Sequence, residues 1–77
     1  MDALSNEARA LMRGADMQNE EFVIVSNNEA ALEEIERHGY THEIMATANP
    51  AYFICDLTPQ GIEKREELVD ANIEGNN

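Results

Sequence analysis

The sequence predicts a single small α+β domain in which helix, strand, helix, strand, strand and helix follow one another. Three observations lead to this order. Apolar residues recur at helical spacing in three segments, apolar residues alternate with polar ones in two others, and isolated glycine and proline residues separate the segments. At 77 residues the chain has room for one core only. We assign residues 1–73 to this domain and expect residues 74–77 to form a disordered tail.

The first helix is expected over residues 2–15, where the apolar side chains fall on one stripe. Gly14, Asp16 and Asn19 then break the helical pattern. Residues 21–25 are rich in β-branched and aromatic side chains and predict a short buried strand. The stripe of the first helix consists of Leu4, Ala8, Leu11, Met12 and Ala15.

The second helix is expected over residues 27–38. Ser26, followed three residues later by Glu29, resembles a capping box that would satisfy free amide groups at the helix start. Gly39 is expected to end the helix, because glycine readily adopts the left-handed conformation common at helix ends. The inner face of this helix is expected to carry Ala31, Leu32 and Ile35, and the face toward water Glu29, Glu33, Glu36 and Arg37.

A β-hairpin is expected next, because the period changes from helical to alternating. Ile44 and Ala46 lie on one strand, residues 53–57 form the other, and residues 48–51 form the turn. Thr58 then caps a last helix that begins at Pro59, where the missing amide hydrogen has no helical acceptor to lose. Its inner side is expected to carry Ile62, Val69 and Ile73, with Leu68 beside them.

These elements predict a three-stranded antiparallel sheet, in which the strand at residues 22–25 joins the hairpin because an isolated hairpin is marginally stable in water. The residues on the inward sides of the elements form the expected core. They are Leu11, Phe22, Ile24, Leu32, Ile35, Ile44, Phe53, Leu57 and Ile62.

Residues 30–68 resemble the second half of a winged-helix domain of the MarR or PadR type. The resemblance is carried by the helix that ends at Gly39-Tyr40, by the hairpin around Asn49-Pro50, and by the phrase Leu57-Thr58-Pro59-Gln60-Gly61 that opens the last helix. It implies a small winged-helix-like fold and DNA binding, with residues 27–38 in place of the recognition helix. The nucleic-acid-binding residues would then be Asn27, Asn28 and Arg37, with Arg9 and Arg13 near phosphate.

Two features depart from that family. The segment between residues 25 and 40 holds one helix, whereas an ordinary winged helix has two before its wing. The net charge is −11, from sixteen acidic and five basic residues, and such a chain repels phosphate. The charge therefore favours a basic surface of another protein as the partner. The expected partner-binding residues are the carboxylates of the second helix, Glu29, Glu33, Glu34 and Glu36.

The sequence predicts neither an enzyme nor a cofactor or metal site. Cys55 is the only cysteine, which excludes an internal disulfide, and its alternation with Phe53 and Leu57 indicates a buried, inert thiol. His38 and His42 lie on either side of Gly39, so they do not share a helical face as ligands of a zinc helix would. His38 is instead expected at the C-terminal end of the helix, where a histidine interacts favourably with the helix dipole.

The compartment is expected to be the cytoplasm. A reducing environment suits the single cysteine, the first seven residues lack the features of a signal peptide, and the longest apolar run, residues 22–25, is too short for a bilayer.

Two functions remain open. In the first, the chain is a non-enzymatic acidic protein-interaction module, similar in composition to phage- or plasmid-type inhibitors that imitate nucleic-acid charge. In the second, it is a small winged-helix DNA-binding transcriptional regulator. The acidity can also serve solubility alone.

Overall fold

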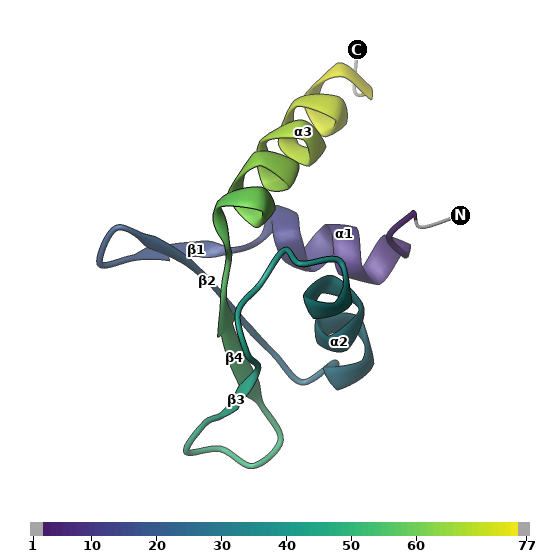
Figure 1. Cartoon of the computed structure of the whole chain (residues 1–77). Coiled ribbons are helices and arrows are strands. Elements are labelled where there is room, and N and C mark those ends of the chain that lie inside the picture. The colour runs from purple at the N-terminus through teal and green to yellow at the C-terminus, as the bar shows by residue number, and fades with distance from the viewer. Residues whose placement is uncertain (1–2, 76–77) are drawn as a thin grey trace.

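A computed structural model describes residues 3–75, with side chains described as far as Ala71. The chain folds into an antiparallel sheet with three helices (Figure 1). The helices are α1 (Asn6–Arg13), α2 (Glu29–Arg37) and α3 (Pro59–Gly75), and the strands are β1 (Asp16–Gln18), β2 (Glu21–Ser26), β3 (Met45–Ala46) and β4 (Phe53–Asp56). The strand order β1-β2-β4-β3 places β1 and β3 at the edges.

The predicted α+β class and the predicted order of elements are confirmed. β2 pairs antiparallel with β4 of the hairpin, with Ile24 opposite Cys55, so the expected third strand is in place. The sheet has one strand more than expected, because β1 forms a second hairpin with β2 in the segment where only a break was predicted.

The β1–β2 turn has a backbone conformation that residues other than glycine, asparagine and aspartate rarely adopt. Gln18 pairs with Glu21, and the two residues between them, Asn19 and Glu20, have φ values of 50° and 68°. Positive φ at both central positions defines the type I′ turn, which matches the twist of a hairpin and favours Asn-Gly. Asn19 suits its place, whereas a glutamate at positive φ is strained.

Glu20→Gly should therefore raise the free energy of unfolding by about 0.5–1 kcal/mol, because glycine adopts positive φ without strain. The matched control is Glu21→Gly in the extended strand β2, where glycine should lower stability. Thermal denaturation of both variants measures the difference. If Glu20→Gly lowered the melting temperature as far as Glu21→Gly, the strain argument would be wrong.

Two helix starts differ from the expectation. α1 begins later than residue 2, because the Ser5 side chain caps it by accepting the amide of Ala8. α2 is capped by Asn28, which accepts the amide of Ala31, so the Ser26–Glu29 capping box is wrong. The Ser26 hydroxyl instead accepts a hydrogen bond from the amide of Asn28, the residue just before the helix. The expected end of α2 is confirmed, since Gly39 has a φ of 79°.

The start of α3 is built as predicted, and it also closes the hairpin. The Thr58 hydroxyl accepts the Gly61 amide and donates to the Gly39 carbonyl at 2.7 Å, while the Thr58 amide donates to the Tyr40 carbonyl at 2.9 Å. These bonds fix the first turn of α3 against the end of α2. A Cβ atom at Gly61 would overlap the Tyr40 carbonyl group, so this close approach requires glycine.

The core lies on one face of the sheet, where α1 and α2 gather in Figure 1. Of the nine expected core residues, Ile24, Leu32, Ile35 and Leu57 are buried, and the other five are half-buried and pack around them. The stripe of α1 contributes more than expected, because Met12 and Ala8 are fully buried. The half-buried five are Leu11, Phe22, Ile44, Phe53 and Ile62.

The inner side of the last helix differs in part from the expectation. Leu68 is buried, Val69 is half-buried, and the side chain of Ile73 lies outside the described residues. Arg65 also packs against the rest of the domain, since its guanidinium lies 4.4 Å from the centre of the Phe22 ring and donates to the Arg13 carbonyl. The helix continues to Gly75, so the first two residues of the expected tail are helical, and residues 76 and 77 lie outside the described part.

Candidate functional site: an acidic groove between α2 and the hairpin

Three of the four expected partner-binding carboxylates line one groove. Glu29, Glu33 and Glu36 recur at the spacing that places side chains on one stripe of a helix. This stripe forms one wall of an open groove of about 290 Å³. The opposite wall and the floor come from the hairpin and consist of Glu43, Ile44, Ala46 and Phe53.

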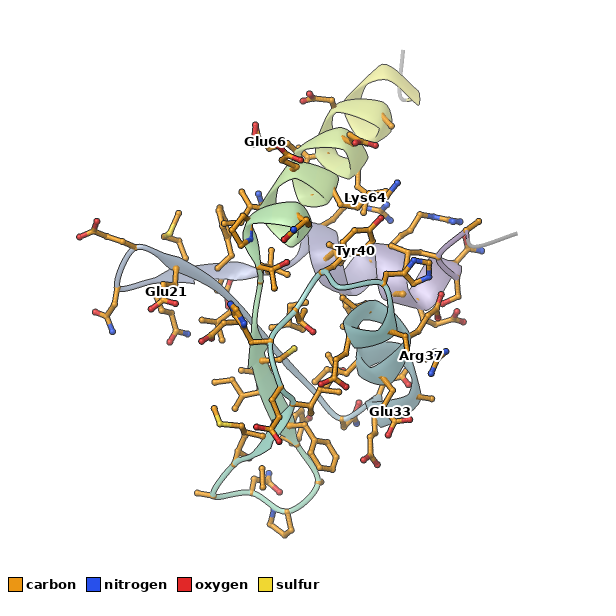
Figure 2. The ribbon with its side chains drawn as sticks, viewed as in Figure 1. Glu21, Glu33, Arg37, Tyr40, Lys64 and Glu66 are labelled. Atoms are coloured by element: carbon orange, nitrogen blue, oxygen red, sulfur yellow. The ribbon has the colours of Figure 1, made fainter. Side chains whose placement is uncertain are left out.

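The groove combines negative charge with an apolar floor. In the described part of the chain the one ion pair joins Lys64 to Glu67 on α3, at 3.5 Å. No described basic side chain therefore neutralises the groove carboxylates by direct contact. Carboxylates that lack a counter-charge raise the local concentration of cations and attract basic groups. Figure 2 shows Glu33 and Arg37, which are four residues apart, projecting from the same side of α2, but no ion pair joins them.

Glu43 was not expected in the site, because strict alternation along a strand places its side chain on the other face of the sheet from that of Ile44. The pairs on either side of this position explain its place. Thr41 lies opposite Leu57 and Met45 opposite Ile54, which leaves the three residues 42–44 facing the two residues 55 and 56. One extra residue on one strand is a β-bulge, and a bulge redirects side chains. Glu43 and Ile44 thus both line the groove.

Glu34 does not belong to the acidic groove, although the sequence grouped it with the other glutamates. Its carboxylate accepts the Ser5 amide at 2.6 Å and the Ser5 hydroxyl at 2.8 Å, and so joins α2 to the start of α1. These two hydrogen bonds hold the pKa of Glu34 below its ordinary value, with smaller contributions from His38 and Arg37. The role of Glu34 is therefore structural.

The Glu34 contact gives a pH-dependent contribution to stability. A carboxylate whose pKa is lower in the folded than in the unfolded state stabilises the fold above its unfolded pKa and loses this effect as pH falls through the folded pKa. We expect Glu34→Gln to lower the melting temperature at neutral pH and the gap to wild type to close in acid. Glu33→Gln, which removes the same charge from the exposed face, is the control and should show no such closing gap. A constant gap for Glu34→Gln would contradict the assignment.

The residues named for DNA contact are not presented together as a reading surface. Asn28 uses its side-chain oxygen to cap α2, whereas Asn27 and Arg37 are exposed. The Arg9 guanidinium donates to the Leu4 carbonyl and the Asn6 side chain and so serves α1 locally. Of this set, Asn27 and Arg37 remain as exposed polar groups at opposite ends of α2.

The described residues hold no group of His, Cys, Asp and Glu side chains with the arrangement of a metal site. Cys55 is 1% exposed, and burial raises the pKa of its thiol, which keeps it protonated and unreactive. His38 follows α2 as its C-cap, as expected, and its ring stacks on Tyr40 with 5.5 Å between centres. His42 is exposed.

No protein-family model, curated protein or solved structure matches this chain. Over the described residues, every helix is too short or too polar to cross a bilayer.

Proposed function

We propose that the chain is a non-enzymatic protein-interaction module whose groove between α2 and the hairpin receives a basic segment of another protein. The observation that carries the proposal is the combination of four carboxylates with the apolar floor of Ile44, Ala46 and Phe53. Carboxylates speed encounter with a basic partner and select against acidic ones, while the apolar floor supplies contact area. The net charge of −11 extends the attraction over the whole surface.

We also propose what kind of protein the partner is. A basic protein surface that normally faces nucleic acid would suit an acidic groove, as for a phage- or plasmid-type inhibitor that imitates nucleic-acid charge. Such a protein would act in the cytoplasm beside its target.

The second candidate is a small winged-helix DNA-binding regulator. The order of α2, hairpin and α3, together with the Leu57–Gly61 turn that resembles the MarR and PadR type, favours it. The face of α2 that lines the groove disfavours DNA binding, because Glu29, Glu33 and Glu36 would lie near the phosphates and repel them.

The test compares two double substitutions of equal charge and spacing. Glu33→Gln with Glu36→Gln removes two groove carboxylates, whereas Glu63→Gln with Glu66→Gln removes two from α3, where Glu66 lies far from Glu33 in Figure 2. The probe is heptalysine, followed by fluorescence anisotropy over a range of salt concentrations. At about 0.5–1 kcal/mol per charge, the groove variant should bind about 5- to 30-fold more weakly. Its affinity should also depend less on salt.

Two outcomes would contradict the proposal. Equal weakening by both double substitutions would show that diffuse charge, rather than the groove, attracts the peptide. Tight binding of the wild-type chain to random duplex DNA at physiological salt would favour the winged-helix regulator instead.

A further inference from the structure

The groove follows an open edge of the sheet. β3 pairs with β4 on one side, and on its other side no strand of the described residues lies beside it. An edge strand presents backbone N–H and C=O groups to any further strand that approaches. Ile44 and Ala46 belong both to this edge segment and to the groove, and α2 forms the facing wall.

We propose that the partner segment binds as an extended strand that adds to the free edge of β3. Strand addition beside a helix is a known mode of peptide recognition, in which main-chain hydrogen bonds give affinity and alternate side chains give specificity. This inference rests on the proposed function, because it assigns a conformation to the basic segment that the groove receives.

One set of side chains of the added strand points into the groove. Successive residues of a strand alternate between the two faces of a sheet, so every second residue of the partner faces α2. There it meets Glu33, Glu36 and Glu43 around the apolar floor. Lysine and arginine fit this position, since their long apolar stems can cover the floor while their charged ends reach the carboxylates.

The other set of side chains lies on the opposite face, where the sheet carries an apolar row. The register places Met45 opposite Ile54 and Ile54 opposite Val25, so the three side chains cross the sheet side by side. Met45 and Val25 are 54% and 50% exposed. A β-branched or aliphatic residue next to Met45 would extend this row as a cross-strand pair.

The recognised segment therefore alternates basic and apolar residues. The direct probe is a capped seven-residue peptide in which four lysines alternate with three valines, and its composition control carries the same residues as one lysine block and one valine block. We expect the alternating peptide to bind about tenfold more tightly than the block peptide. Met45→Gln should reduce this preference, because it removes the apolar neighbour of the partner's valine.

Backbone pairing is tested without altering the protein. Two versions of the alternating peptide carry N-methyl groups, one on its internal lysines and the other on its valines. An added strand directs the amides of alternate residues toward β3, so one version should lose about tenfold in affinity, and the other should bind as the parent does. Met45 and Ala46 direct their amides to opposite edges of β3, so hydrogen exchange should slow at the one whose amide points away from β4 when the parent peptide is bound.

The outcomes separate this inference from the proposed function. If the peptides bind in a manner sensitive to Glu33→Gln with Glu36→Gln, but both N-methylated versions bind equally and the β3 amide at the open edge stays unprotected, strand addition is overturned and the interaction module stands. A basic segment bound as a helix would give this result. If the groove substitutions have no effect on any peptide, both proposals fail.

Discussion

Replacing Leu32 or Ile35 with alanine should lower the free energy of unfolding by about 2–5 kcal/mol. Both side chains of α2 are fully buried in the core beneath the sheet. Each substitution removes apolar contact and leaves a cavity that the surrounding residues fill incompletely. In a domain of this size the loss is a large part of the total stability. Urea denaturation followed by circular dichroism measures it.

The control is Val25→Ala, which removes apolar atoms from a side chain that is 50% exposed on the other face of the sheet. It should cost less than about 1 kcal/mol. Similar losses for all three variants would show that α2 does not present the face assigned to it.

Replacing Gly61 with alanine should destabilise the protein by about 2–4 kcal/mol, although alanine is the better helix former. The added methyl group would overlap the Tyr40 carbonyl, so the first turn of α3 must move away from the end of α2. That movement strains the hydrogen bonds that Thr58 makes to Gly39 and Gly61. Thermal denaturation should show a lower melting temperature.

Gly14→Ala is the matched control, because a Cβ atom at Gly14 would lie 3.4 Å from the nearest carbonyl oxygen, which is near ordinary contact. It should leave the melting temperature nearly unchanged. An unchanged melting temperature for Gly61→Ala as well would contradict the close approach of α3 to Tyr40.

The sequence predicts those parts of the fold that short-range chemistry determines. Gly39 ends α2, Thr58 and Pro59 start α3, and the hairpin lies between them, because capping and turn preferences act within a few residues. β1 was not predicted, because its own residues carry little signal for a strand or a turn. Asp16 has low strand preference, and Asn-Glu is a poor signal for a type I′ turn, so only pairing with β2 makes this segment a strand.

The site was predictable in its charge and less so in its shape. Helical spacing groups Glu29, Glu33 and Glu36, and the groove confirms that these three lie together. The same spacing cannot show that Glu34 meets Ser5, which is 29 residues away in the chain. Nor can alternation anticipate the bulge that brings Glu43 into the groove. Tertiary contacts decided both cases.

The hydrogen bonds of Thr58 have a consequence for local unfolding. They tie the two ends of the segment from Tyr40 to Leu57 to each other, while the tip around Asn49 is held mainly by contacts of Thr47. Opening of the hairpin can then begin at the tip and stop at its base, without releasing α2 from α3. Amide exchange should accordingly be faster at Ala51, whose exposed amide donates to the Asn49 side chain, than at Thr58, whose amide donates to the Tyr40 carbonyl. The tip, residues 47–52, can thus separate and close again while β4 stays paired with β2 and the rest of the domain stays folded.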